Sequence, residues 1–134
     1  MAENLTLEVV TPERILLKEE SYSIIVPATE GLMGLWPNHA PIITGLNPGI
    51  IKYRQNDNMR VLAIGGGFME VSDNKVSILA DSAELPEEID VTRAAAAKER
   101  AQKRLKELPP GMDVHRAELA LSRALARLEA AEYK

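Results

Sequence analysis

Six arginines in the last third of the chain fall into two sets of three with identical spacing. The sets are Arg93, Arg100 and Arg104, and Arg116, Arg123 and Arg127. At these intervals of seven and four residues, the members of a set would lie within about 20° of one another on a helix. Aligned guanidinium groups bind phosphates and carboxylates, often through two parallel hydrogen bonds. The spacing therefore indicates an anion-binding surface, unless ion pairs within the helices already neutralise these charges.

Acidic neighbours can neutralise only half of these arginines. Side chains three or four positions apart on a helix face one another. Such pairs are Asp90–Arg93, Arg104–Glu107 and Asp113–Arg116. Arg100, Arg123 and Arg127 have no acid at those positions, so they suggest an anionic ligand or an acidic protein surface as partner. A solvated helix face remains the alternative interpretation.

The first of these arginines lies at a predicted helix start. The stretch EEIDVTRAAAAKERA, residues 87–101, predicts a helix whose N-terminal cap is Asp90. Arg93 would occupy the third helical position, where Glu or Gln completes a capping box. The helix dipole disfavours a cation there by roughly 0.3–1 kcal/mol, while the same helix end favours anions. We therefore expect Arg93 to contribute to an anion site.

Other candidate motifs predict no catalytic centre. GGGF at residues 65–68 lacks the Lys and Ser or Thr of a P-loop and predicts a bulge or a close backbone approach. His39 has no evident nucleophile or paired acid, and we expect a structural or interface role for it. The absence of Cys excludes a disulfide framework and thiolate metal sites. No catalytic triad or metal constellation is evident, so we expect a non-enzymatic protein with no required cofactor.

The 134 residues divide into two parts of different composition. Residues 1–85 carry six basic and eleven acidic side chains, whereas residues 86–134 carry ten basic and nine acidic ones and most of the alanines. We predict one domain over each of these ranges. The net charge of −4 disfavours general nucleic-acid binding. No apolar run approaches the ~18 residues of a membrane span, and the N-terminus lacks a signal-peptide pattern, so we expect no direct membrane insertion.

The first part has the pattern of short strands separated by turns. In LTLEVV, residues 5–10, apolar and polar residues alternate, as in a half-buried strand. Further strands are predicted at YSIIVPA, GIIKYR, MRVLAI, FMEVS and KVSILA, and turns at EGLMG, LNPG, QNDN and SDN. At least six such strands favour a β-sandwich or barrel. The apolar loop around Trp36 fits either a protein–protein contact or packing in the core.

The second part changes to helical spacing. Its first helix has an apolar stripe of Ala94, Ala97, Ala101, Leu105 and Leu108. LPPGM then ends that helix, and Asp113 is a suitable cap for the next. The second helix has an apolar stripe of Val114, Leu121, Leu125 and Leu128, flanked by Ala117, Ala124 and Ala131. The small alanine faces of the two helices would let them pack closely. Two helices joined by so short a turn predict an antiparallel hairpin, which buries little area and is expected either to dock or to move.

Six segments, in this order, resemble the epsilon subunit of bacterial F-type ATP synthases. They are VVTPE (9–13), EGLMGLWPNHAPIITGLNPG (30–49), GGGFMEVSDNKVSILAD (65–81), EEIDVTRA (87–94), AAKERA (96–101) and RAELALSRALARL (116–128). The resemblance covers nearly the whole chain, and the helices look most like those of Bacillus-type subunits. Trp36 and Asn38 depart from the usual LPGHAP pattern, and Leu85 stands where Arg is frequent.

The resemblance implies a β + α fold, with a ten-stranded β-sandwich followed by an antiparallel two-helix hairpin. It also implies a non-catalytic rotor subunit in the central stalk of the proton-translocating ATP synthase. The complex would place the subunit peripherally at the cytoplasmic face of the bacterial cell membrane. The sandwich would bind the gamma subunit and the c-subunit ring. The hairpin, when extended along gamma, would reach the alpha and beta subunits of the catalytic head and inhibit ATP hydrolysis.

For Bacillus-type members the resemblance further implies that the compact hairpin binds ATP as a regulatory ligand. The matching positions are Glu84, Ile89, Asp90, Arg93, Ala94, Arg100, Arg123 and Arg127. They include the IDxxRA motif and the three arginines that have no acidic neighbour within their helix. The alternative is the same stalk role with a purely mechanical hairpin that does not sense ATP. A nucleic-acid-binding hairpin is disfavoured because no stacking aromatic residues flank the arginines, and the sequence shows no Mg²⁺ site.

Overall fold

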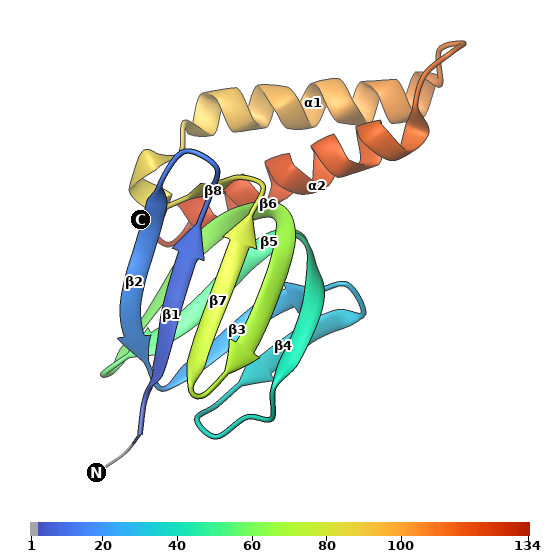
Figure 1. The fold of residues 1–134 in the computed structure, drawn as a ribbon. Coiled ribbons are helices and arrows are strands. Elements are labelled where there is room, and N and C mark those ends of the chain that lie inside the picture. Colours follow the sequence, from blue (N-terminus) through green and yellow to red (C-terminus); the bar gives the residue numbers. More distant parts are fainter. Residues whose placement is uncertain (1–2) are drawn as a thin grey trace.

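A computed structural model describes residues 3–134 and shows a strand-rich body with a pair of helices laid across it (Figure 1). The strands are β1 Leu5–Val10, β2 Ile15–Ser21, β3 Ser23–Ala28, β4 Gly31–Leu35, β5 Ile42–Gln55, β6 Asn58–Ser72, β7 Lys75–Ala80 and β8 Ala83–Glu84. They are followed by the short 3-10 helix η1, Pro86–Glu88, and by the α-helices α1, Val91–Glu107, and α2, Val114–Ala131.

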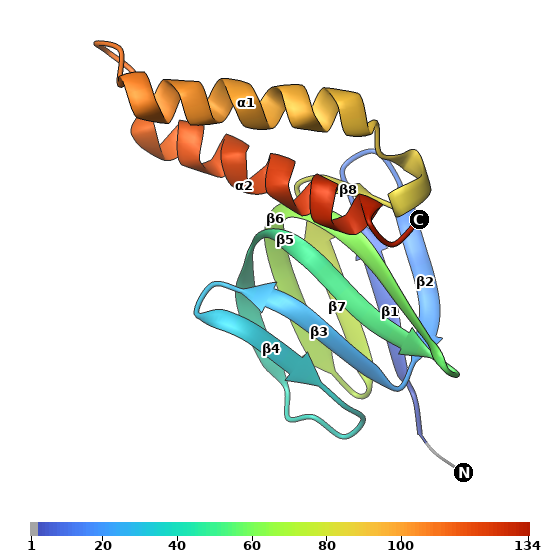
Figure 2. The same cartoon turned by 180° about the vertical axis from the view of Figure 1, so that it is seen from behind.

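All eight described strands belong to one mixed sheet. The hydrogen-bonded order is β2-β1-β7-β6-β5-β3-β4, and β8 pairs with β6. Only the β1–β7 pair is parallel among these strands. The sheet folds over itself, so that β1, β2 and β7 form one layer and β3 and β4 the other (Figures 1 and 2). The main hydrophobic core, which includes Leu7, Ile24, Ile51 and Ile78, fills the space between the layers.

The predicted count of ten strands is wrong, because two long strands pass through both layers. β5 has 14 residues and β6 has 15, whereas strands of about 5–6 residues are usual. The predicted turn LNPG lies inside β5, and the segments MRVLAI and FMEVS are one strand, β6. Their pairing is continuous, with Leu46 opposite Gly67 and Pro48 opposite Gly65. Proline and glycine therefore bend these strands without ending them.

The glycines of the GGGF segment permit this bend, as the sequence predicted. Gly66 and Gly67 have φ values of +100° and +147°, which side-chain-bearing residues rarely adopt. A Cβ on Gly67 would lie 2.2 Å from the carbonyl oxygen of Leu79. The prediction of a close backbone approach is confirmed. The hairpin turns predicted at QNDN and SDN are also present, since they join β5 to β6 and β6 to β7.

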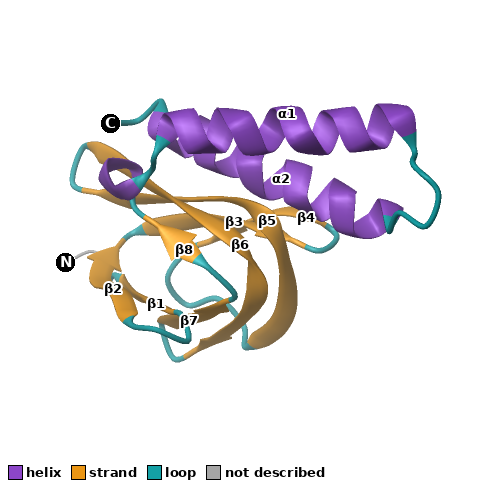
Figure 3. Ribbon diagram, turned by 90° about the horizontal axis from the view of Figure 1, so that it is seen from above, coloured by secondary structure: helices purple, strands orange, loops and turns teal. Residues whose placement is uncertain are grey.

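The two helices form the predicted antiparallel hairpin, which Figure 3 shows from above. Asp90 precedes α1, and its Oδ1 accepts the Arg93 N–H at 3.0 Å. Asp113 precedes α2 and accepts the Arg116 N–H at the same distance, 3.0 Å. Both predicted caps are confirmed. α1 ends at Leu108 in a left-handed conformation with φ +46°, immediately before the two prolines.

α2 is the helix that attaches the hairpin to the sheet. Side chains alternate between the faces of a strand, so β5 and β6 direct one set inward to the core and another outward. The outward set forms a second apolar cluster with the linker and α2: Ile50, Val61, Ala63, Ile89, Ala126 and Ala130, all buried. α1 packs on α2 and lies farther from the sheet (Figures 1 and 2).

Alanines form the contact faces of α2, as predicted, whereas the adjoining apolar stripe is only partly buried. Its buried residues are Ala117, Ala124, Ala126 and Ala130. Leu125 is 44% exposed, and Val114 and Leu108 are also exposed. Small side chains let helices and sheet approach closely, but each removes little apolar surface from water, at roughly 25 cal/mol per Å². The docking of the hairpin is therefore close in distance and modest in free energy.

We predict that Ala126→Glu releases the hairpin and leaves the sandwich folded. Burying an unpaired carboxylate costs several kcal/mol, which is on the order of the whole stabilisation that the small cluster provides. Because the chain has no Cys, spin labels on cysteines introduced at Gln102 and Glu70 would report the distance between helix and sheet. Leu125→Glu is the matched control, since that exposed neighbour tolerates a charge. An unchanged distance in Ala126→Glu would contradict the prediction.

Candidate functional site

A cavity of about 320 Å³ lies where the linker meets the two helices. Its lining residues are Glu84, Glu88, Asp90, Arg93, Ala94, Ala97, Arg100 and Arg127. β8 and η1 supply the two glutamates, α1 and its cap supply the next five residues, and α2 supplies Arg127. A cavity of this volume is within the range of small-molecule sites, about 300–1,000 Å³.

The chemistry of this cavity, and not its volume, distinguishes it from others. Cavities of about 490, 380 and 390 Å³ lie elsewhere on the surface, and none of the three is lined by more than one arginine. The cavity at the linker has three guanidinium groups and three carboxylates in its lining. We therefore treat it as the candidate site, and we call it the hairpin cavity.

The structure brings six of the eight predicted site residues into the hairpin cavity. They are Glu84, Asp90, Arg93, Ala94, Arg100 and Arg127. Ile89 does not line it, because its side chain is buried in the apolar cluster under α2. Sequence reasoning missed Ala97 and Glu88. Ala97 follows Ala94 by three positions on the same helical face and could have been found by spacing, whereas Glu88 lies outside the helix and carries no such signal.

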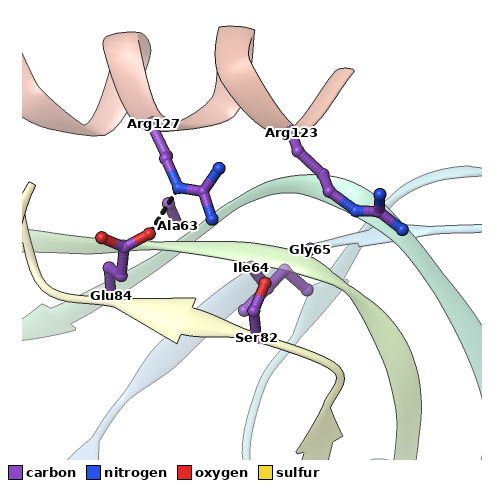
Figure 4. A pocket seen from close by; sticks show the side chains of 7 residues that line it. All are labelled: Ala63, Ile64, Gly65, Ser82, Glu84, Arg123 and Arg127. Carbon is purple, nitrogen blue, oxygen red and sulfur yellow. Dashed lines mark hydrogen bonds and ion pairs between the residues drawn. The ribbon is translucent and has the colours of Figure 1, made fainter. Parts of the chain in front are cut away.

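Arg123 lines a much smaller neighbouring pocket, of about 10 Å³, together with Gly65, Ser82, Glu84 and Arg127. Figure 4 shows its guanidinium group directed away from that of Arg127. A Cβ on Gly65 would lie 2.3 Å from the Ser82 Oγ and 3.5 Å from the Arg123 Nε. The glycine thus leaves room for the Ser82 hydroxyl in this pocket.

The ion pairs in the structure differ from those predicted between neighbouring residues of each helix. Among the described residues, no ion pair joins Asp90 to Arg93, Arg104 to Glu107 or Asp113 to Arg116. The two aspartates accept the backbone N–H groups of the helix starts instead. Arg127, by contrast, forms an ion pair through its Nε with Glu84 Oε1 (Figure 4). These two residues are 43 positions apart, so a search within the helix could not find the pair.

Glu88 is held from two sides at the edge of the hairpin cavity. Its Oε1 accepts the backbone N–H of Leu85 at 2.9 Å, and its two carboxylate oxygens lie 2.9 and 2.8 Å from Arg14 Nη2. The Leu85 N–H and, to a lesser extent, the Arg14 guanidinium lower the pKa of Glu88 below its ordinary value of 4.5. Glu88 is therefore a fixed negative charge at neutral pH.

The charges that line the hairpin cavity favour the binding of a polyanion. Among residues 3–134, Arg93 and Arg100 have no carboxylate partner within ion-pair distance, and both line the hairpin cavity with Arg127. The first turn of α1 lies beside them, and the start of a helix favours negative charge. Phosphate or carboxylate oxygens bound here would obtain charge-assisted hydrogen bonds. No group of three or more His, Cys, Asp or Glu among the described residues could hold a metal ion.

The loop around Trp36 is partly core and partly surface. Leu35 and Leu46 are buried, whereas Leu32 is exposed and Trp36 is 58% exposed. Asn38 has φ +68°, a conformation that Asn tolerates better than most residues, so its place in the LWPNHAP segment is compatible with a tight turn. Its backbone N–H donates to Asn74 Oδ1 at 2.6 Å. The exposed part of this loop favours a protein contact.

A second exposed apolar surface crosses the sheet. Register places Val10 beside both Ile15 and Leu79, and Leu79 beside Phe68. Ile15, Leu79 and Phe68 are each exposed, as is Ile43 on β5. We call Val10, Ile15, Ile43, Phe68 and Leu79 the apolar row. An exposed, contiguous apolar surface of this kind is typical of a protein interaction site, and the alternation within KVSILA could have indicated Leu79.

Comparisons with known proteins assign the chain to a family. Residues 4–86 match the family described as the ATP synthase Delta/Epsilon chain, beta-sandwich domain. Residues 87–132 match the family described as the ATP synthase Delta/Epsilon chain, long alpha-helix domain. Between them the two families cover nearly all of the sequence. Within residues 3–134, neither helix is long and apolar enough to cross a membrane.

Similar proteins agree with this assignment. The chain is 53% identical over 105 residues to the ATP synthase epsilon chain of Desulfitobacterium hafniense strain Y51, covering 78% of this chain and 80% of that protein. It is 43% identical over 132 residues to the ATP synthase epsilon chain of Desulforamulus reducens, covering 98% of this chain and 100% of that one.

Solved structures show the same fold. A chain in the OSCP/F1/c-ring structure of the Euglena gracilis mitochondrial ATP synthase superimposes with a TM-score of 0.81 at 28% identity, covering 96% of this chain and 81% of that one. A chain of the Tetrahymena thermophila mitochondrial ATP synthase, at 16% identity and a TM-score of 0.60, shares the fold over 97% of this chain and 98% of its own length. The protein belongs to the epsilon subunit family of F-type ATP synthases, which are subunits of the central stalk and not the catalytic ones.

Proposed function

We propose that this stalk subunit couples rotation in a proton-translocating ATP synthase and inhibits ATP hydrolysis through a mobile hairpin that binds ATP in its compact state. The observation that carries this proposal is the hairpin cavity. Arginines from both helices and carboxylates from the linker line it together, and they meet only while the hairpin is folded and docked. A ligand that needs all of them stabilises the compact state at the expense of the extended one.

The charges of the hairpin cavity support a nucleoside triphosphate as the ligand. Arg93 and Arg100 supply cations without carboxylate partners, and Arg127 can exchange Glu84 for a phosphate. Three arginines on facing elements repel one another, and a polyphosphate between them removes that repulsion. This gives ATP a physical reason to prefer the compact hairpin. Arg123, which lies in the neighbouring pocket, would approach the phosphates through a change of side-chain rotamer.

The two exposed apolar surfaces support the proposed partners in the rotor. The hairpin covers neither the apolar row nor the exposed part of the Trp36 loop. We propose that they provide contacts to the gamma subunit and to the c-subunit ring. The subunit would then lie peripherally at the cytoplasmic face of the bacterial cell membrane. The extended hairpin would run along gamma toward the alpha and beta subunits of the catalytic head.

One observation favours the alternative of a purely mechanical hairpin. The pair between Arg127 and Glu84 neutralises one of the three cavity arginines without any ligand, and the alanine contacts hold the hairpin in place. In that alternative the subunit keeps its stalk role, the arginines contact acidic protein surfaces, and ATP has no effect on the hairpin.

We predict that the isolated subunit binds ATP and that Arg93→Gln or Arg100→Gln weakens binding at least tenfold. Each variant loses a charge-assisted hydrogen bond, a difference of about 1.5–3 kcal/mol. Isothermal titration calorimetry measures the affinity directly. Arg104→Gln is the matched control, because this residue of the same stripe does not line the cavity. The absence of saturation at millimolar ATP would reject the ligand, and equal losses in all three variants would reject the site.

A further prediction separates the two alternatives. Deletion of residues 86–134 removes the inhibitor in both, so ATP hydrolysis by the assembled synthase should rise. In the full-length subunit, ATP should shorten the mean distance between labels at Gln102 and Glu70 only if the hairpin senses the nucleotide. A hairpin whose label distance stays constant up to millimolar ATP, in a subunit whose deletion still activates hydrolysis, would establish the mechanical alternative.

A further inference from the structure

Arg14 reaches from the sandwich to the edge of the hairpin cavity. It lies in the turn between β1 and β2, and its Nη2 is 2.8 and 2.9 Å from the two carboxylate oxygens of Glu88. The two residues are 74 positions apart in the sequence. Glu88 lines the hairpin cavity, but Arg14 does not. Arg14 therefore meets the Glu88 carboxylate from the sandwich side, away from the cavity arginines.

Glu88 is an unexpected residue for the wall of an anion site. Of the other two carboxylates in the wall, Glu84 pairs with Arg127 and Asp90 accepts the Arg93 N–H. Among the described residues, Glu88 forms no ion pair with Arg93 or Arg127, and the Leu85 N–H that it accepts is neutral. Its lowered pKa keeps it ionised at neutral pH. Without a cation of its own it would repel an anionic ligand, or attract the side chains of Arg93 and Arg100 that the ligand requires.

We propose that Arg14 is a positioning residue of the nucleotide site, which acts by neutralising Glu88 and holding its carboxylate away from the cavity arginines. The inference rests on the proposed function, because it concerns binding of a polyanion at the same cavity. It extends the site to the turn between β1 and β2, whereas all the residues predicted from sequence lie between residues 84 and 127. In this role Arg14 supports the recognition of phosphate groups by the cavity arginines.

The exposure of the Arg14–Glu88 pair argues against a purely structural role in which it only ties the linker to the sandwich. The side chains of Arg14 and Glu88 are 47% and 34% exposed, and exposed ion pairs contribute little to stability. The Leu85 N–H holds the Glu88 carboxylate to η1 independently of Arg14, and Ile89, the next residue, anchors the linker in the apolar cluster. Loss of Arg14 therefore changes the charge of the cavity edge more than it changes the course of the chain.

The test compares ATP binding by the wild-type subunit, Arg14→Gln, Glu88→Gln and the double variant, by calorimetry at low ionic strength. Arg14→Gln exposes the negative charge and should weaken binding on the order of fivefold to tenfold, the effect expected of one charge several ångströms away. Glu88→Gln removes that charge and keeps the acceptor for Leu85, so binding should stay within about twofold of wild type or become tighter. The double variant should recover wild-type affinity to within about twofold.

The outcomes separate the possible failures. Equal weakening in all three variants would overturn the proposal in favour of a structural tether, and circular dichroism would confirm that each variant is folded. Weakening in Glu88→Gln that exceeds that in Arg14→Gln would overturn it in favour of a direct contact between Glu88 and the ligand. Wild-type affinity in Arg14→Gln would reject the role of Arg14 alone. Absence of binding by the wild type would reject this inference and the nucleotide site together. The loss in Arg14→Gln should also diminish at high salt, because screening weakens the repulsion.

Discussion

The contact between α2 and the outward face of β5 and β6 determines the arrangement of everything C-terminal to the sandwich. It consists of three strand side chains, Ile89 of the linker, and alanines of α2. Small residues permit a close approach and provide little apolar area, so the contact is specific in its geometry and moderate in its strength. The proposed movement of the hairpin, away from the sandwich and back to it, would need both properties.

The charges of the hairpin cavity depend on that contact. α2 carries Arg127 to Glu84 at the end of β8, and it supports α1, which carries Arg93 and Arg100. The linker is fixed by the buried Ile89 on one side and by the Glu88–Arg14 pair on the other. Undocking would therefore disperse three cations and three carboxylates at once. Because undocking would separate these groups, a ligand of the cavity can act on the position of the hairpin.

Sequence alone predicted the features that depend on local chemistry. The caps Asp90 and Asp113 and the turn after α1 follow from hydrogen-bonding capacity and backbone preference. Helical spacing and the lack of acidic neighbours indicated the cavity arginines, whereas the family resemblance alone indicated Glu84 and Ala94. The errors have a common cause in contacts between distant segments. The strand count failed because the bend at Pro48 and Gly66 is supported by pairing across β5 and β6, and the Arg127–Glu84 and Arg14–Glu88 pairs join elements with no periodic relation. The packing of small alanine faces was predicted correctly, with Ala117 and Ala124 buried, whereas the exposure of Leu125 in the adjoining stripe was not predicted.

The position of α1 as the outer helix has its own consequence. α1 rests on α2, so it can separate without disturbing the cluster formed by Ile50, Val61 and the alanines of α2. Such a separation would remove Arg93 and Arg100 from the cavity while Arg127 remained beside Glu84. Attachment to the sandwich thus rests on α2, whereas two of the three cavity arginines lie on α1. In the proposed mechanism, a form attached by α2 alone would lie between the compact and extended states and would lack two of the cations that a polyanion requires.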